Sequence, residues 1–107
     1  MEKFIVLSIY TDGSYNETHR TYVVEDRKTA VKLGNAILDA FVKTELADGW
    51  EKDEFEKWGD FKTLDNKVIW NEKHQQRVKI MKMVEVSDFE IVEERDEYGK
   101  FYFVETK

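Results

Sequence analysis

The sequence predicts an α+β domain, in which a largely antiparallel sheet of about four to six strands carries one main amphipathic helix and one short acidic helix on one face. Three observations predict it. Several short segments rich in β-branched and aromatic residues have the period of a strand, one longer segment has the period of a helix, and turn residues separate them. The chain has 107 residues, of which 41% are hydrophobic and 37% charged, so we expect one folded domain spanning residues 1–107.

The first expected unit is a hairpin over residues 3–25. The segment Phe4–Tyr10 (FIVLSIY) is β-branched or apolar at nearly every position, which is typical of a strand that is covered on both faces or lies centrally in a sheet. The following residues, TDGSYNETHR, are rich in turn formers, and Thr21–Val24 (TYVV) resumes an extended pattern. We therefore expect two strands joined by a long loop.

The main helix is expected over residues 27–47. Asp26 can cap it, because its side chain can accept a hydrogen bond from a backbone amide of the first turn. Gly34 lowers helix propensity by up to about 1 kcal/mol relative to alanine, which indicates close approach to a strand. Residues 48–49 (DG) supply a stop. The positions expected to face the sheet recur at steps of three and four: Ala30, Leu33, Ile37, Ala40, Phe41 and Thr44.

The segment 45–61 (ELADGWEKDEFEKWGDF) mixes aromatic rings with acids. Eight carboxylates and three lysines lie between Thr44 and Asp65. Residues 51–58 are expected to form two helical turns, with Phe55 and Trp58 on one face and Gly59 as the stop. This is the short acidic helix of the predicted fold.

Three or four strands are expected in the rest of the chain. Val68–Trp70 is a short strand candidate, and residues 78–86 alternate with a period of two, interrupted by a charge at Lys82. Residues 89–93 and 100–104, joined by the turn 96–99 (DEYG), form a closing hairpin.

Composition excludes several classes of protein. The chain has no cysteine, so it can hold neither a disulfide nor a thiolate metal site. It has no signal-like start and no apolar run approaching the ~18 residues of a membrane span, so we expect a cytoplasmic protein. Its net charge of -6 disfavours direct binding to DNA or RNA, because lysines and arginines supply the affinity for phosphates.

No catalytic or metal-binding motif is recognisable. His19 and His74 fall in polar connections without the spacing of metal ligands, so we expect surface histidines, no metal and no cofactor. Carboxylates are plentiful, but acid–base catalysis needs one of them desolvated in a cleft. A deep pocket that held two carboxylates with opposed pKa shifts would indicate an enzyme; without such a signal, we expect a protein that is not an enzyme.

The charges are arranged in blocks along the chain. The net charge is -5 over residues 44–65, +4 over residues 66–84 and -6 over residues 85–99. This pattern is typical of either an internally complementary surface or a surface with one strongly negative side.

The aromatic residues among the acids are either core or contact residues. In a domain of this size such rings are more often core, but a short peripheral helix buries only a narrow face, so one or two rings can stay half exposed and anchor a partner. The candidate binding residues are Trp50, Glu51, Asp53, Glu54, Glu56, Trp58, Asp60, Glu93, Glu94, Asp96 and Glu97.

The order of segments resembles that of the small acidic anti-CRISPR proteins that bacteriophages use to block DNA-cutting CRISPR effectors. The resemblance covers about a third of the chain: a strand (Tyr22–Val24), an amphipathic helix (Ala30–Phe41), and a GW pair followed by acids interleaved with aromatics (Gly49–Phe61). It implies that acidic side chains occupy the effector's DNA-reading site. On this chain those would be Glu51, Asp53, Glu54, Glu56 and Asp60. The basic block from Lys67 to Lys82 departs from that pattern and leaves the target open.

Together these observations predict a protein of a phage or mobile element that inhibits a nucleic-acid-processing protein, such as a CRISPR effector, through a carboxylate-rich, DNA-mimicking surface. The expected partner is a basic protein, with no membrane involved, and binding should weaken steeply as salt rises. The alternative is a structural or assembly module, in which the basic block of one copy meets an acidic block of another and edge strands pair into a homodimer.

Overall fold

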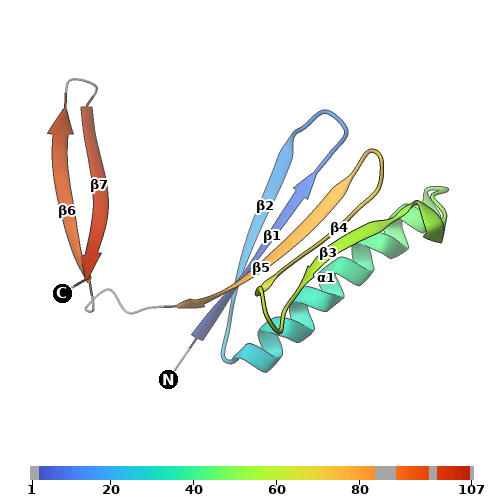
Figure 1. The fold of residues 1–107 in the computed structure, drawn as a ribbon, viewed down its shortest axis with the longest axis horizontal. Coiled ribbons are helices and arrows are strands. Elements are labelled where there is room, and N and C mark those ends of the chain that lie inside the picture. The colour runs from blue at the N-terminus through green and yellow to red at the C-terminus, as the bar shows by residue number, and fades with distance from the viewer. Residues whose placement is uncertain (1–2, 84–88, 97–98, 107) are drawn as a thin grey trace.

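The computed structural model describes residues 3–83, 89–96 and 99–106, and the side chains of residues 3–83 only. A five-stranded antiparallel sheet has the order β2-β1-β5-β4-β3, and β6 and β7 form a separate two-stranded sheet (Figure 1). The predicted α+β class is confirmed. The elements are β1 (Lys3–Thr11), β2 (Glu17–Val24), α1 (Arg27–Ala47), a 3-10 turn η1 (Lys52–Glu54), β3 (Glu56–Asp60), β4 (Asn66–Trp70), β5 (Gln75–Met83), β6 (Phe89–Asp96) and β7 (Gly99–Thr106).

The predicted first hairpin forms and supplies an inner strand of the larger sheet, but its loop is shorter than expected, because β2 begins at Glu17 rather than Thr21. β1 pairs with β2 on one side and with β5 on the other, so it lies centrally in the sheet, which is one of the two positions that its apolar sequence predicts. The Asp12 carboxylate organises the loop between β1 and β2, because its Oδ1 accepts hydrogen bonds from the backbone amides of Ser14 (2.8 Å) and Asn16 (3.1 Å).

α1 begins and ends where the sequence predicts, but it is rotated relative to the predicted face. Asp26 caps the first turn, and its Oδ1 accepts a hydrogen bond of 2.7 Å from the amide of Thr29. The buried positions are Ala30, Gly34, Leu38, Phe41 and Glu45. Leu33 and Ile37 are partly buried and pack against the core as expected, whereas Ala40 and Thr44, also expected to face the sheet, are exposed on one flank of the helix, where they line a groove with Ile37.

The core lies between α1 and the middle of the five-stranded sheet. Its buried members are Val6, Ala30, Leu38, Phe61, Val78 and Ile80. Gly34 makes the close contact possible, because a Cβ atom there would lie 2.9 Å from Cζ of Phe61 and 3.1 Å from Cγ1 of Val78. The predicted close approach of this glycine to a strand is confirmed.

The predicted acidic helix over residues 51–58 is wrong. Only Lys52–Glu54 form a single 3-10 turn, and the next five residues are strand β3, which pairs with β4 in the register Trp58↔Val68. A helix of two turns is marginal on its own, whereas an extended segment gains a ladder of hydrogen bonds along the sheet edge. Gly59, expected to be a helix stop, adopts φ +85° within β3, where a Cβ would lie 2.2 Å from the carbonyl oxygen of Asn66.

The later strands agree with the prediction where they are described. β4 contains the predicted strand Val68–Trp70 and extends it to Asn66, and β5 begins at Gln75, three residues earlier than predicted. Residues 84–86 of that predicted strand lie outside the described residues. β6 and β7 pair as a hairpin in which Asp96 is opposite Gly99, as expected for the closing unit. Among the described residues, no helix is both long and apolar enough to cross a membrane.

Two glycines with positive φ test how closely β3 approaches β4. Gly59→Ala should lower the free energy of unfolding by about 2–4 kcal/mol, because it adds a clash with the β4 backbone to the strain of a left-handed conformation. Gly49, with φ +105° and open space around it, is the matched control. Gly49→Ala should lower the free energy by only about 1 kcal/mol. Urea unfolding measures both, and equal losses would contradict the close approach.

Candidate binding surface

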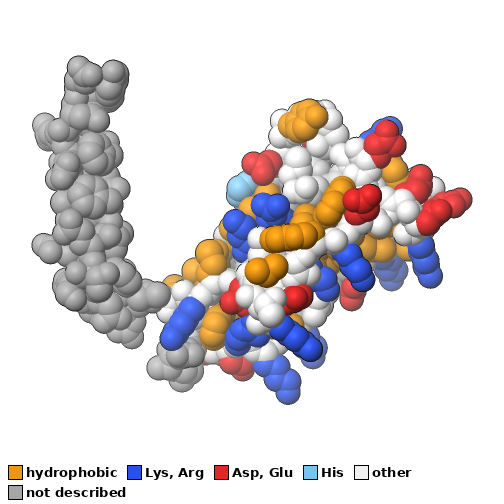
Figure 2. Space-filling model, viewed as in Figure 1, with side chains coloured by type: hydrophobic (Ala, Val, Ile, Leu, Met, Phe, Trp, Pro, Cys, Tyr) orange, Lys and Arg blue, Asp and Glu red, His pale blue; other side chains and the backbone are white. Residues whose placement is uncertain are grey.

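The face of the five-stranded sheet opposite α1 is the starting point for a binding surface. Val6 and Val78 point into the core beneath the helix. Because side chains alternate along a strand, Ile9, three residues after Val6 in β1, and Arg77, next to Val78 in β5, lie on the opposite face. The same register places Val68 of β4 and Trp58 of β3 in that row. Figure 2 shows hydrophobic side chains grouped over the strands, with lysines, arginines and acids around them.

Trp58 lies at the outer end of this row. Its side chain is 51% exposed, although it borders a hollow of about 330 Å³ that Val68, Trp70, Gln75 and Arg77 also line. The Nε atom of Arg77 is buried and has no hydrogen-bond partner among the described residues. A half-exposed indole of this kind is suited to anchor a contact with another protein.

Five acids lie before or beside Trp58 in the chain, in the 3-10 turn and in β3. Glu56 and Asp60 flank it on the same face of β3, and Glu51, Asp53 and Glu54 lie in and beside the 3-10 turn just before the strand. All five are exposed. We call the hollow lined by Trp58, Val68, Trp70, Gln75 and Arg77, together with the exposed carboxylates of Asp53 and Glu56, the Trp58 surface.

Two of the predicted binding acids have structural roles. Oε2 of Glu54 accepts a hydrogen bond of 2.7 Å from the amide of Glu51, which closes the 3-10 turn. Oδ1 of Asp60 accepts hydrogen bonds from the amides of Lys62 (2.8 Å) and Thr63 (2.7 Å), and the Thr63 hydroxyl donates to the same carboxylate. The hydrogen bonds from Thr63 and Lys62 lower the pKa of Asp60. Asp53 and Glu56 make no such bond among the described residues, so their charges are available to a partner.

The other predicted binding residues do not join this surface in the described structure. Trp50 is half buried at the end of α1, where its ring meets His74 edge-on at 6.4 Å between centroids. Glu93, Glu94 and Asp96 belong to β6, whose side chains lie outside the described residues, as does Glu97 altogether.

A buried polar cluster near Trp50 was not expected from the sequence. Glu45 is only 3% exposed, accepts a hydrogen bond of 3.1 Å from Nδ2 of Asn71, and pairs with Nδ1 of His74. The prediction of a surface histidine is therefore wrong for His74, whose side chain is 27% exposed. Within residues 3–83, no three acidic or histidine side chains are placed to hold a metal ion together.

Sequence reasoning also missed Val68, Trp70 and Arg77 as parts of the surface. The missing signal was the alternation Glu56, Trp58, Asp60, which has the period of a strand and puts all three on one face. The density of acids in residues 51–58 suggested a solvated helix instead.

Alanine substitutions of Trp58 and Phe61 test whether each ring is a surface residue or part of the core. Trp58→Ala should lower the free energy of unfolding by about 1 kcal/mol or less, because half of the side chain is already in water. Phe61→Ala should lower it by about 3–5 kcal/mol, because this ring is 5% exposed and packs against Gly34 and Val78. Urea denaturation of both variants checks this difference. A loss for Trp58→Ala as large as that for Phe61→Ala would make Trp58 a core residue.

The hydrogen bonds to Asp60 predict a specific pH dependence. Its folded-state pKa is lowered, so the carboxylate stabilises the fold above the ordinary aspartate pKa of about 3.9, and this contribution is lost as pH falls through the folded value. Asp60→Asn keeps an acceptor for the amides but carries no charge. Its urea midpoint should therefore fall less steeply than that of the wild type below about pH 4. Asp53→Asn is the control for removing a nearby exposed carboxylate, and identical acid limbs for Asp60→Asn and wild type would contradict the assignment.

Comparison of the chain with known proteins identifies no relative. No protein-family model matches the chain, and neither a curated protein nor a solved structure matches it significantly. The resemblance to acidic anti-CRISPR proteins stays a prediction, and a function for the chain has to be argued from its own residues and surfaces.

Proposed function

We propose that the protein is a non-catalytic binding protein that holds a basic protein partner on the Trp58 surface. The observation that carries the proposal is Trp58 itself, a tryptophan 51% exposed between two exposed acids on an edge strand. Tryptophan side chains at the centre of a contact contribute more binding energy than most residues, and acids around them favour a positively charged partner.

Within this proposal, the partner is a nucleic-acid-processing protein of the host cytoplasm, such as a CRISPR effector, and the protein comes from a phage or mobile element. Such partners carry grooves of arginine and lysine for phosphates, and carboxylates can compete for them. β3 changes how that competition works. Glu56 and Asp60 are four residues apart on a strand and so lie about 13 Å from each other, which means that they do not form the closely spaced helical row expected from the sequence. The half-exposed ring of Trp58 supplies an apolar contact that charge alone does not.

The charges of Asp53 and Glu56 can be reversed with little effect on the fold. Asp53→Lys/Glu56→Lys changes the net charge by +4 without removing a described hydrogen bond, whereas Glu54 and Asp60 hold turns in place. Asp39→Lys/Glu72→Lys is the matched control, because it makes the same change in net charge at two exposed acids outside the Trp58 surface.

The experiment is affinity capture from a lysate of bacteria that contain a DNA-cutting CRISPR system, followed by mass spectrometry. The wild type should retain a nucleic-acid-binding protein that salt or duplex DNA releases, because both weaken or compete with charge contacts. Asp53→Lys/Glu56→Lys and Trp58→Ala should each reduce capture by at least about tenfold, and Asp39→Lys/Glu72→Lys should not. Equal loss in both charge variants, or a captured partner that DNA does not displace, would contradict the proposal.

Self-association is the second candidate function, and one observation favours it. β2 is an eight-residue strand at the end of the sheet order, so its outer edge is unpaired within the described part of the chain. An unpaired edge can add a strand from a second copy. Light scattering across concentrations distinguishes this function from the first, since a stable dimer would favour β2 pairing and a monomer leaves the Trp58 surface as the interacting site.

A further inference from the structure

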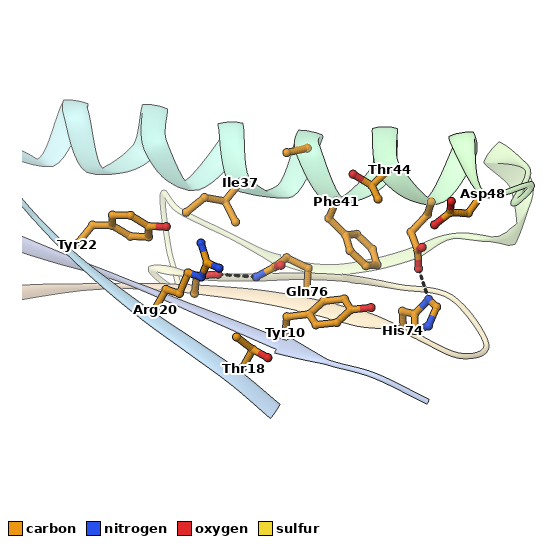
Figure 3. A pocket seen from close by; sticks show the side chains of 13 residues that line it. Tyr10, Thr18, Arg20, Tyr22, Ile37, Phe41, Thr44, Asp48, His74 and Gln76 are labelled. Atoms are coloured by element: carbon orange, nitrogen blue, oxygen red, sulfur yellow. Dashed lines mark hydrogen bonds and ion pairs between the residues drawn. The ribbon is translucent and has the colours of Figure 1, made fainter. Parts of the chain in front are cut away.

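A groove between α1 and β2 is a second site, separate from the Trp58 surface and on the other face of the sheet. It has a volume of about 440 Å³, within the range of small-molecule sites. Its walls come from the flank of α1 and from the inward-facing positions of β2, and β1 and β5 form its floor (Figure 3). It exists because α1 packs mainly over the inner strands and leaves the edge strand β2 uncovered on its inner side.

Apolar and aromatic groups line most of the groove. The ring of Tyr10 lies 6.2 Å from that of Phe41 between centroids, and Ile37 and Tyr22 continue the apolar wall towards the other end. The floor is polar but already satisfied, because Nε2 of Gln76 donates to Oγ of Ser8 at 2.9 Å. A ligand would therefore place a flat apolar body against the rings rather than seek hydrogen bonds from the floor.

One cation faces this space without a counterion. Arg20 reaches from β2 toward α1 beside Gln76 (Figure 3), and it has no ion pair or hydrogen bond among the residues whose side chains are described. A guanidinium beside apolar walls is suited to a carboxylate, with which it can form two parallel hydrogen bonds.

The far end of the groove has the opposite charge. Asp48 lies at the carboxyl end of α1, and the buried Glu45 is nearby, so this end disfavours a second anion. The hydroxyl of Tyr10 faces the same end, and its pKa is raised by burial and by the charges of Glu45, Asp12 and Asp48, so it stays protonated and can donate a hydrogen bond. A ligand that is anionic at one end and a neutral hydrogen-bonding group at the other matches this polarity.

We propose that the groove binds a small aromatic monocarboxylate, with the carboxylate on Arg20, the ring against Tyr10 and Phe41, and a neutral polar group directed toward Asp48. This activity goes beyond the proposed partner binding and does not depend on it, because no residue of the Trp58 surface lines the groove.

The test is a titration of ¹⁵N-labelled protein with 3-(4-hydroxyphenyl)propionate, followed by amide chemical shifts. Saturable shifts should appear around residues 18–22, 37–44 and 74–76, with a Kd of about 1 mM or tighter. The neutral methyl ester should bind at least about tenfold more weakly, because it cannot pair with Arg20. 3-(4-Carboxyphenyl)propionate should also bind at least about tenfold more weakly, because its second carboxylate meets Asp48 and Glu45.

Three variants locate the site. Arg20→Gln should remove the preference for the acid over its ester, and Ala40→Phe should block the groove while leaving Arg20 in place, since Ala40 is exposed and lines the wall. Lys32→Gln is the matched control, because it removes one positive charge from an exposed helix position outside the groove, and it should bind as the wild type does. No saturable shifts below about 10 mM would overturn the proposal. Equal binding of acid and ester, or shifts centred on Trp58, would overturn it as well.

Discussion

A single helix is too narrow to cover a five-stranded sheet, and the other features of this molecule depend on that limit. Five strands spaced about 4.8 Å apart span roughly 19 Å between the outer strand axes, whereas a helix with its side chains is about 10 Å wide. α1 is seated by Gly34, which lets the helix approach Phe61 and Val78, and Arg27 at its first turn donates to the carbonyl of Phe61 and pairs with Asp65. This places the helix over the inner strands and toward the turn after β3. The inner side of β2 is then left without cover.

The two candidate sites follow from this packing and from strand alternation. On the helix side, the uncovered strip between α1 and β2 contains an unpaired arginine and aromatic walls. On the opposite side, the row from Ile9 to Trp58 has no helix above it in the described structure. The groove has a defined volume and charge at both ends, which suits a small molecule, whereas the Trp58 surface is shallower and ringed by acids, which suits a protein. The two candidate sites therefore share no lining residue.

The sequence was sufficient for the α+β class, the first hairpin, the helix with its Asp26 cap and the close approach at Gly34, because each has a local signal. It was insufficient for residues 51–60. There the density of acids favoured a solvated helix. The segment is a strand because β3 pairs with β4, and a pairing between separate segments has no local signal in the sequence. The candidate acids of residues 51–60 are exposed, as expected, but the structural roles of Glu54 and Asp60 depend on turns that could not be predicted from the sequence. The groove could not be predicted for a related reason, since a rotation of the helix by about one position decides whether Ala40 and Thr44 enter the core or line a wall.

The pairing of β1 with β5 also has a consequence for folding. β1 and β5 are the first and the last strand of the five-stranded sheet along the chain. The hydrogen bond between Ser8 and Gln76 links residues that are 68 positions apart. The entropy of closing so long a loop is lost before the stabilising contacts form. Proteins dominated by contacts between residues distant in sequence therefore fold more slowly than proteins dominated by local contacts. During synthesis, β1 and β2 leave the ribosome first and can form a hairpin at once. β5, the second partner of β1, and half of the buried core residues (Phe61, Val78 and Ile80) are synthesised only with the last third of residues 3–83, so until then one edge of β1 is open to other chains.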